Sequence, residues 1–191
     1  MKYVRRLLWF VASKVLIVSL VVVILVFAFY YSMDAANIYT LLGDGLKQRT
    51  SVILTRQDPE YLKSFFRNEF LNNDEPLRVG LSQSSPYLNY KITGFDSSVT
   101  LESVWSWPWS NTATATVTYR VSNITGAPAS GAQSADGGAL PANPPAWATG
   151  RYTMGLIRQN GQWKIASMQQ TQVLVDPTPS PHPTVSATAG P

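Results

Sequence analysis

The acids, hydroxyls and single histidine of this 191-residue sequence form no clear catalytic constellation. The chain has no cysteine, and its one histidine, His182, stands between prolines near the C-terminal end, where we expect it to be solvated. Asp96 and Glu102 fall on or near predicted strands, so either could face a cavity as a general base, or they could be a turn aspartate and a solvent-facing glutamate. The segment Gly80–Ser84 lacks the second glycine of a nucleophile elbow. We therefore expect no enzyme, and neither a metal nor a cofactor.

The most unusual chemistry lies in three closely spaced tryptophans, Trp105, Trp107 and Trp109. Strand alternation would point the three indoles to one side until Pro108, which cannot donate to a neighbouring strand and so marks an edge or a bulge. Such a row could fill a core, contact a partner or the membrane, or hold a small ligand. The full set of candidate interaction or pocket residues is Trp105, Trp107, Trp109, Tyr119, Trp147 and Trp163.

These candidates must be positioned relative to a membrane, because Val15–Tyr31 is an unbroken apolar run without a charge. A helix of that length covers roughly 26 Å, close to the thickness of about 30 Å of a hydrocarbon core. Four basic residues precede the run, whereas Asp34 follows it and no basic residue occurs before Lys47. By the positive-inside rule we expect residues 1–14 to be cytoplasmic, the run to be a single transmembrane helix, and the rest of the chain to be extracytoplasmic.

A cleaved signal peptide is the alternative, because it also combines a basic start with an apolar core. We favour an uncleaved signal anchor, since the run exceeds the usual apolar core of about 7–15 residues. The segment after the run also lacks a small-x-small cleavage site, because Met33 or Asp34 would occupy the position that needs a small residue.

The charge balance agrees with this topology. Of the 15 Lys and Arg residues, four precede the run, which leaves 11 basic residues against 11 acidic residues. The part outside the cytoplasm is therefore formally neutral, and the net charge of +4 does not predict nucleic-acid binding.

Two helices are predicted after the membrane. Residues 34–55 have helical apolar spacing that continues from the span, with Gly43-Asp44-Gly45 as an expected hinge or irregularity. A second helix is predicted to begin at Asp58, a good N-cap, followed by a proline and a glutamate that suit the first turn. We expect this helix to end in a turn at Asn72–Pro76.

From Tyr87 onward the apolar period changes from helical spacing to alternation, which predicts strands. The clearest strand covers residues 113–121, where alanine, valine and tyrosine alternate with polar residues. Its small alanines predict that bulky side chains fill the space opposite, and the tryptophans are the candidates. Strands at Trp147–Arg158 and Gln162–Val175 flank Asn160-Gly161, so we expect them to form an antiparallel hairpin.

Two segments have the composition of flexible chain. Residues 125–146 are rich in Gly, Ala, Ser and Pro and are predicted to form a long mobile loop. Residues 176–191 are rich in Pro, Thr and Ser and are predicted to form a disordered tail.

The order of two helices and then antiparallel strands ending in a hairpin resembles the nuclear transport factor two superfamily, also called cystatin-like. The residues that carry this resemblance are Asp58-Pro59-Glu60 before an aromatic stripe and the segment Arg158–Ile165, RQNGQWKI, and the likeness covers Asp34–Val175. It implies an α+β fold in which a transmembrane helix precedes a cone-shaped domain at residues 32–175. In that domain, two or three helices would pack on a curved antiparallel sheet.

Within that superfamily, one span before one extracytoplasmic domain resembles three groups of proteins. These are the assembly component of type IV secretion and conjugation machines, the related membrane proteins of Gram-positive conjugative elements, and membrane proteins associated with mammalian-cell-entry transporters. The resemblance implies a non-catalytic assembly or adaptor module of a bacterial envelope complex. Its partners would be the lipid bilayer and other envelope proteins or a second copy of itself. The alternative is a small-ligand-binding or enzymatic cone, because soluble members of the superfamily catalyse reactions in the mouth of the cone.

Overall fold

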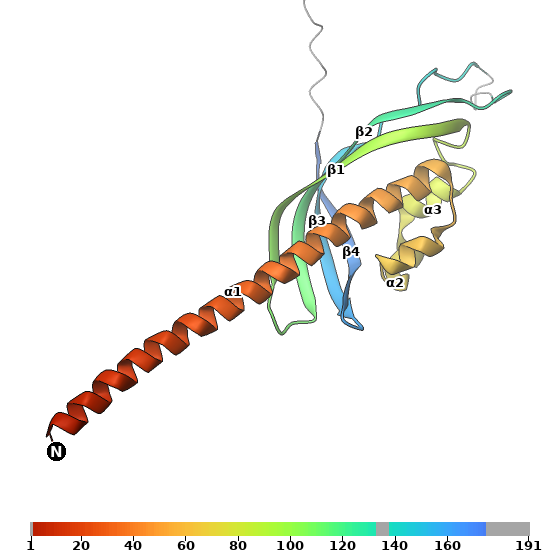
Figure 1. The fold of residues 1–191 in the computed structure, drawn as a ribbon. Helices are drawn as coiled ribbons and strands as arrows, with labels where there is room; N and C mark the ends of the chain where they lie inside the picture. The colour runs from red at the N-terminus through yellow and green to blue at the C-terminus, as the bar shows by residue number, and fades with distance from the viewer. Residues whose placement is uncertain (1, 133–137, 175–191) are drawn as a thin grey trace, which may run out of the picture.

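The computed structural model describes residues 2–132 and 138–174. Within these ranges it has the predicted α+β class, with a long N-terminal helix, three short helical segments and a curved four-stranded antiparallel sheet (Figure 1). The tail predicted at residues 176–191, with His182, lies outside the described residues, as does the middle of the predicted loop.

Helix α1 (Lys2–Thr55) carries both the apolar run and the first part of the domain (Figure 1). At about 1.5 Å per residue, its 54 residues extend over about 80 Å. Its most apolar 18-residue window has a mean hydropathy of 2.9 and no buried residue, so it is long and apolar enough to be a single-pass membrane anchor. Further along the same helix, Ile38, Leu42 and Leu46 are fully buried in the domain.

The hinge predicted at Gly43-Asp44-Gly45 is wrong, because α1 continues through these residues as one helix. Gly45 instead allows α1 to pack closely against Phe65 and Ile165. A Cβ atom at this position would lie 3.2 Å from Cβ of Phe65 and 3.3 Å from Cδ1 of Ile165. The missing side chain therefore lets α1 approach the segment that follows it and the last strand.

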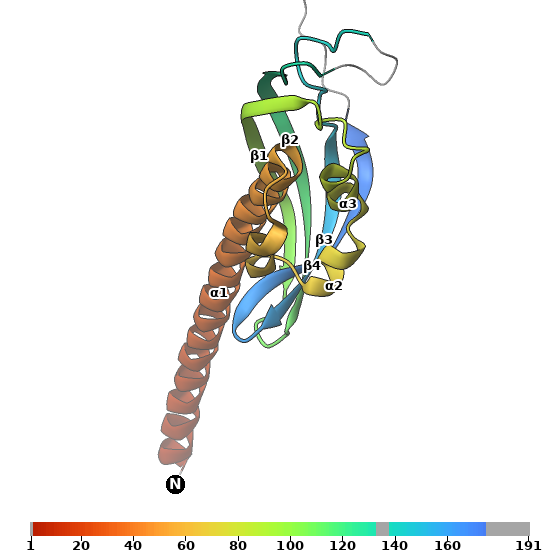
Figure 2. The same ribbon diagram turned by 90° about the vertical axis from the view of Figure 1, so that its right-hand side faces the viewer.

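The sheet is a meander in which each strand pairs antiparallel with the next one (Figure 2). Asn160 and Gly161 both have positive φ, 51° and 81°, which confirms the predicted Asn-Gly hairpin. Residues 125–128, predicted to begin the mobile loop, belong to the second strand instead. The strands are β1 (Tyr90–Ser106), β2 (Thr112–Pro128), β3 (Thr149–Gln159) and β4 (Gln162–Leu174).

The core lies between the domain part of α1, the short helices and the sheet. Every second residue of β2 from Ala113 to Val121 is buried, as the alternation predicts. The cluster that contains Ala113 and Ala115 is filled by α1 side chains and by aromatic residues such as Phe66. The prediction that Trp105–Trp109 fill this space is wrong, since all three tryptophans are exposed.

A β-bulge in β1 explains the outward position of the tryptophans. The pairing register with β2 shifts between Leu101 and Ser103. One extra residue moves every later side chain to the opposite face of the sheet. Val99 and Leu101 are partly buried against the core before the bulge, whereas after it Ser106 is buried and Trp105 is 69% exposed.

The second predicted helix is broken by a strand-like pairing. Asp58 caps as predicted, and its carboxylate accepts a hydrogen bond from the Glu60 amide at 2.9 Å, but the segment that follows is a 3-10 helix, η1 (Pro59–Ser64). Phe66 then pairs with Ile165 of β4 in a parallel bridge. Backbone groups used in this pairing are not available to a helix, so the helix ends here.

Two short helices follow, α2 (Asn68–Asn73) and α3 (Glu75–Leu81). The turn predicted at Asn72–Pro76 therefore contains the start of a helix. Asp74 is its N-cap, and its carboxylate accepts a hydrogen bond from the Leu77 amide at 3.4 Å.

Candidate functional site

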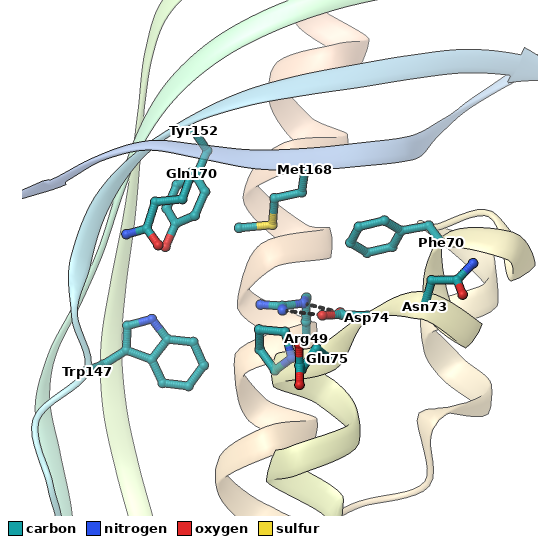
Figure 3. A pocket seen from close by; sticks show the side chains of 10 residues that line it. Arg49, Phe70, Asn73, Asp74, Glu75, Trp147, Tyr152, Met168 and Gln170 are labelled. Carbon is teal, nitrogen blue, oxygen red and sulfur yellow. Dashed lines mark hydrogen bonds and ion pairs between the residues drawn. The ribbon is translucent and has the colours of Figure 1, made fainter.

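A pocket of about 300 Å³ opens between α1, the α2–α3 segment and the strands β3 and β4 (Figure 3). Aromatic and apolar side chains and one ion pair form its wall. Its volume is at the lower end of the range for small-molecule sites, about 300–1,000 Å³. The residues that line it include Arg49, Phe70, Asp74, Trp147, Tyr152 and Met168.

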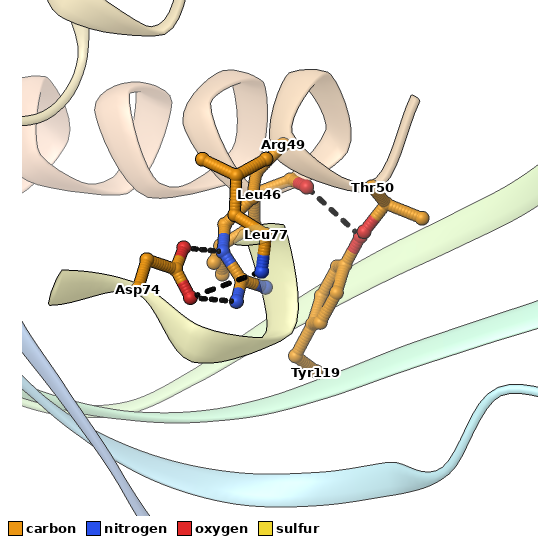
Figure 4. Close-up of polar contacts among 6 residues, drawn as sticks. All are labelled: Leu46, Arg49, Thr50, Asp74, Leu77 and Tyr119. Atoms are coloured by element: carbon orange, nitrogen blue, oxygen red, sulfur yellow. Dashed lines mark hydrogen bonds and ion pairs between the residues drawn. The ribbon is translucent and has the colours of Figure 1, made fainter. Parts of the chain in front are cut away.

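The ion pair in this pocket joins α1 to α3. Arg49 donates from Nε to Oδ2 of Asp74 at 2.6 Å and from Nη2 to Oδ1 at 2.7 Å (Figure 3). Both side chains are buried, with exposed fractions of 5% and 3%. The Asp74 carboxylate also caps α3 (Figure 4). A carboxylate held by a bidentate guanidinium and a helix cap is positioned for structure rather than for proton transfer.

Tyr119 is a core residue and is not among the residues that line the pocket. Its hydroxyl donates to the Leu46 carbonyl at 3.1 Å, so the Thr50 hydroxyl, 2.7 Å away, donates to it in turn (Figure 4). Burial raises the pKa of Tyr119 to about 12, although the hydrogen bond with Thr50 opposes this shift. The side chain is only 1% exposed, so Tyr119 is placed in the core and not on an accessible surface.

The two carboxylates considered as bases lie away from the pocket. Asp96 is exposed on β1 and accepts a hydrogen bond from Nδ2 of Asn123 at 2.6 Å. Glu102 accepts a hydrogen bond from Thr118 at 2.7 Å and pairs with Arg151. The hydrogen bond from Thr118 is the main cause that lowers the pKa of Glu102, and Arg151 lowers it further.

Trp147 and Trp163 occupy different places. Trp147 forms one wall of the pocket and stacks on Tyr87, with ring centroids 6.4 Å apart. Trp163 is buried on β4, where its Nε1 donates to Oδ1 of Asp34 at 3.4 Å. The Arg158 guanidinium lies 4.5 Å from the centre of the Trp163 ring, within the range of a cation–π contact.

The other three tryptophans form a separate cluster at the turn between β1 and β2, and we call Trp105–Asn111 the tryptophan tip. Trp105, Trp107 and Trp109 are 69%, 43% and 72% exposed. The centroid of the Trp107 ring is 6.2 Å from that of Trp105 and 5.5 Å from that of Trp109. The tip therefore presents a continuous aromatic surface.

This aromatic surface contacts the apolar run of α1. The Phe27 ring lies edge-on to Trp107 and Trp109, with centroid distances of 5.6 and 5.9 Å. An apolar groove of about 390 Å³ continues from the contact along α1, between Val22 and Tyr30 on the helix and Pro108 on the tip. The tryptophan tip thus lies beside the upper part of the predicted membrane span.

The six candidate residues thus lie in three places: Tyr119 and Trp163 in the core, Trp147 in the pocket wall, and Trp105, Trp107 and Trp109 in the tryptophan tip. Arg49 was not among the candidates predicted from the sequence. One signal for Arg49 was available. It lies three residues after Leu46 and three before Val52, so a cation occupies the apolar stripe of the helix. A charge in such a stripe is buried, and a buried charge needs a partner.

Within residues 2–132 and 138–174, no group of three histidine or acidic side chains could hold a metal ion. Comparisons of this chain with protein-family models, with curated proteins and with solved structures give no match.

Proposed function

We propose that this protein is a non-catalytic, membrane-anchored module whose extracytoplasmic domain makes contacts within a bacterial envelope complex, of the kind found in secretion or conjugation machines. Residues 1–14 would lie in the cytoplasm, and the domain would lie on the other side of the membrane. The basic residues before the apolar run favour this orientation.

The continuity of α1 from anchor to core carries the proposal. The apolar run is exposed, whereas Ile38, Leu42 and Leu46 of the same unbroken helix are buried in the domain. No flexible linker separates the two parts, so the domain is held at one height and in one orientation above the bilayer. A diffusing catalyst has no need of this constraint, whereas a component of a larger assembly does.

Hydrogen bonds near the end of the apolar run also attach α1 to the sheet of the domain. The Tyr31 hydroxyl donates to the Val104 carbonyl of β1 at 2.8 Å. One turn later Asp34 accepts hydrogen bonds from Arg158 and from Nε1 of Trp163. These contacts attach both hairpins of the sheet to the helix where it leaves the membrane.

The state of the carboxylates supports a function without chemistry. A general base must be accessible and have a pKa suited to accept a proton. Asp74 is already held by Arg49 and by the α3 amide. The pKa of Glu102 is lowered, which makes it a weaker base.

The outer half of β4 offers a surface for a protein partner. Edge strands commonly avoid pairing with other chains by carrying charged residues or prolines. Ser167–Val173 contains neither. Within the described residues, Phe65–Arg67 pair with the free edge of β4 only around Ile165. The strand beyond this point could accept a strand from a partner by β-augmentation.

Photo-crosslinking of the full-length chain in intact cells tests the contacts. A photoreactive amino acid at Gln172, on the open part of β4, is expected to form a defined product with another envelope protein or with a second copy. The same amino acid at Tyr61, exposed on η1, is the matched control and is expected to form none. A purified chain that turns over a small substrate, without any product at Gln172, would contradict the proposal.

A second arm tests the orientation. The chain has no cysteine, so Asn160→Cys creates a single thiol at the β3–β4 turn. A membrane-impermeant maleimide should label this thiol on intact cells. Labelling only after lysis would contradict the proposed orientation.

The pocket favours a second candidate function, the binding of a small ligand. Trp147, Tyr152 and Met168 offer apolar and aromatic contacts around about 300 Å³. Native mass spectrometry of the detergent-purified protein should then detect a retained small molecule. Met168→Trp, which fills the pocket, should abolish retention. Equal spectra without a bound mass for both chains would reject this candidate.

A further inference from the structure

We propose that the tryptophan tip is a second membrane contact, with its indole rings in the interfacial region of the leaflet that lies beneath the domain. The inference rests on the proposed function in one respect, namely that α1 spans the membrane. It adds that the domain itself touches lipid through β1 and β2.

The depth of the tip follows from its contact with α1. Trp107 and Trp109 both touch Phe27. Phe27 lies four residues before Tyr31, the end of the apolar run, which corresponds to about 6 Å along the helix axis. A ring that contacts Phe27 is therefore inside the boundary of the bilayer whenever the apolar run is inserted.

The tip cannot easily lift away from this position. The hydrogen bond from Tyr31 to the Val104 carbonyl holds β1 on the helix one residue before Trp105. The hairpin also packs on α1 along β1, and the sheet is attached again where Asp34 binds Arg158. The depth of the tip is thus set by the folded domain.

The composition of the tip suits the interface of a bilayer. No charged residue occurs between Glu102 and Arg120, so a charge does not oppose insertion. Pro108 has no amide hydrogen, and the Ser110 amide donates to the Trp107 carbonyl at 2.8 Å, which limits the polar backbone left for lipid to solvate. Tryptophan is itself enriched at membrane interfaces.

The neighbouring hairpin provides an internal contrast. The β3–β4 turn reads Arg158-Gln159-Asn160-Gly161-Gln162 and holds no aromatic residue. Its Arg158 binds Asp34, seven residues beyond Phe27 on α1, or about 10 Å further from the bilayer centre. The apolar turn therefore lies at the level of the span, and the polar turn lies above it.

Lipid is the occupant that these observations favour. The exposed face of the tip continues directly into the exposed face of the span, which includes the groove from Val22 to Tyr30. A protein partner would have to enter the same membrane depth to cover it. If they faced water, these three adjoining tryptophans would form a contiguous apolar patch of the kind that soluble monomers rarely expose.

Probe accessibility in nanodiscs tests the inference with the full-length chain. Trp109→Cys and Asn160→Cys, made in the cysteine-free chain, are each labelled with the fluorophore NBD and placed in phosphatidylcholine–phosphatidylglycerol discs that hold one copy. Dithionite, a membrane-impermeant anion, is expected to reduce the label at 109 at least about tenfold more slowly than the label at 160, because anions partition poorly into the bilayer. Equal rates would overturn the inference.

A third label separates failure of the inference from failure of the anchor. Val21→Cys places NBD in the middle of the apolar run, and it must be protected if α1 spans the disc. Protection at 21 with free access at 109 would reject the lipid contact and leave the anchor intact. Free access at 21 would reject the anchor itself. Protection at 109 only in discs with two copies would assign the tip to self-association and would also overturn the inference.

Discussion

Asp34 on α1 binds Arg158 on β3, although 124 residues separate them in the sequence. Asp34 is the first charged residue after the apolar run, and its side chain is 8% exposed. The same carboxylate accepts a hydrogen bond from Trp163, whose ring lies beneath the Arg158 guanidinium. One buried carboxylate thus joins the helix, just after its apolar run, to the second hairpin.

Asp34→Ala removes this junction and leaves Arg158 and the Trp163 N–H without their acceptor. We expect a loss of about 2 kcal/mol in the free energy of unfolding, because partly buried donors would lose their partner. Thermal unfolding of the full chain in detergent, followed by near-ultraviolet circular dichroism, measures it. Asp44→Ala, at an exposed position on the same helix, is the control and should change little.

Arg49→Met is expected to be more destabilising, by about 3–5 kcal/mol, because it leaves the Asp74 carboxylate buried without its cation. The double variant Arg49→Met with Asp74→Asn removes both charges and keeps a residue that can cap α3. It should recover most of the lost stability in urea unfolding experiments. A double variant as unstable as Arg49→Met alone would show that packing, not charge, dominates at this position.

Tyr119→Phe tests the buried hydroxyl through its pH dependence. The folded-state pKa of about 12 is above the ordinary value of 10, so the unfolded chain releases this proton first as the pH rises. The native chain should therefore lose about 3 kcal/mol of stability between about pH 10 and pH 12 through this residue. Burial also raises the pKa of Tyr87 and of Tyr152, so these residues add to the loss of stability as the pH rises.

Near neutral pH, Tyr119→Phe should be less stable than the parent by about 1 kcal/mol, because its hydrogen bonds are lost. The stability curves of the two chains are expected to cross above about pH 10, since the variant lacks the alkaline loss. Tyr61→Phe, which removes an exposed hydroxyl, should follow the parent curve. Parallel curves for Tyr119→Phe and the parent would disprove the expected coupling.

Alanine substitutions at two helical glycines should change the free energy of unfolding in opposite directions. A Cβ atom at Gly43 meets nothing within 4 Å, so Gly43→Ala should stabilise the chain by about 0.5–1 kcal/mol through helix propensity. A Cβ atom at Gly80 would lie 2.6 Å from Cγ2 of Ile53, so Gly80→Ala should cost about 1–3 kcal/mol. The double variant Gly80→Ala with Ile53→Val keeps the clashing Cγ2 methyl, so it should be no more stable than Gly80→Ala alone. The double variant with Ile53→Ala lacks this methyl and should relieve the clash. Differential scanning calorimetry in detergent compares the variants.

Local chemistry made several elements predictable from the sequence. The alternation along β2 reports a strand with one buried face, and this held from Ala113 to Val121. The Asn160-Gly161 turn needs two residues that accept positive φ, and the sequence supplies them. The apolar run before Asp34 likewise predicts an exposed helix without reference to any other part of the chain.

The position of the tryptophans could not be predicted in the same way. The bulge after Leu101 depends on how β1 pairs with β2, and no glycine or proline marks it in the sequence. Extending the alternation through the bulge assigns Trp105 and Trp107 to the wrong face. The pairing of Phe66 with Ile165, which ends η1, is similarly a tertiary contact between distant segments.

The candidate pocket could not be predicted from the sequence, because its residues are brought together only by tertiary contacts. Arg49 could be suspected as a buried charge, but its partner Asp74 stood inside a predicted turn. The sequence Asp74-Glu75-Pro76 provides an N-cap, an acidic residue in the first turn and an early proline, a pattern that predicts the start of a new helix. Only the fold brings Trp147 and Met168 to the same opening.

The unbroken course of α1 sets a rule for how this chain can change in length. One residue inserted between Tyr31 and Asp34 would rotate everything before it by about 100° around the helix axis and shift it by about 1.5 Å. Phe27 would then point away from Trp107, while the domain contacts beyond the insertion would stay in place. Insertions of seven residues nearly restore the angular phase, to within about 20°. Such an insertion still moves Phe27 about 10 Å away from Trp107 along the helix axis, so the length of α1 between Phe27 and Asp34 fixes the height of the domain above the apolar run as well as its rotation.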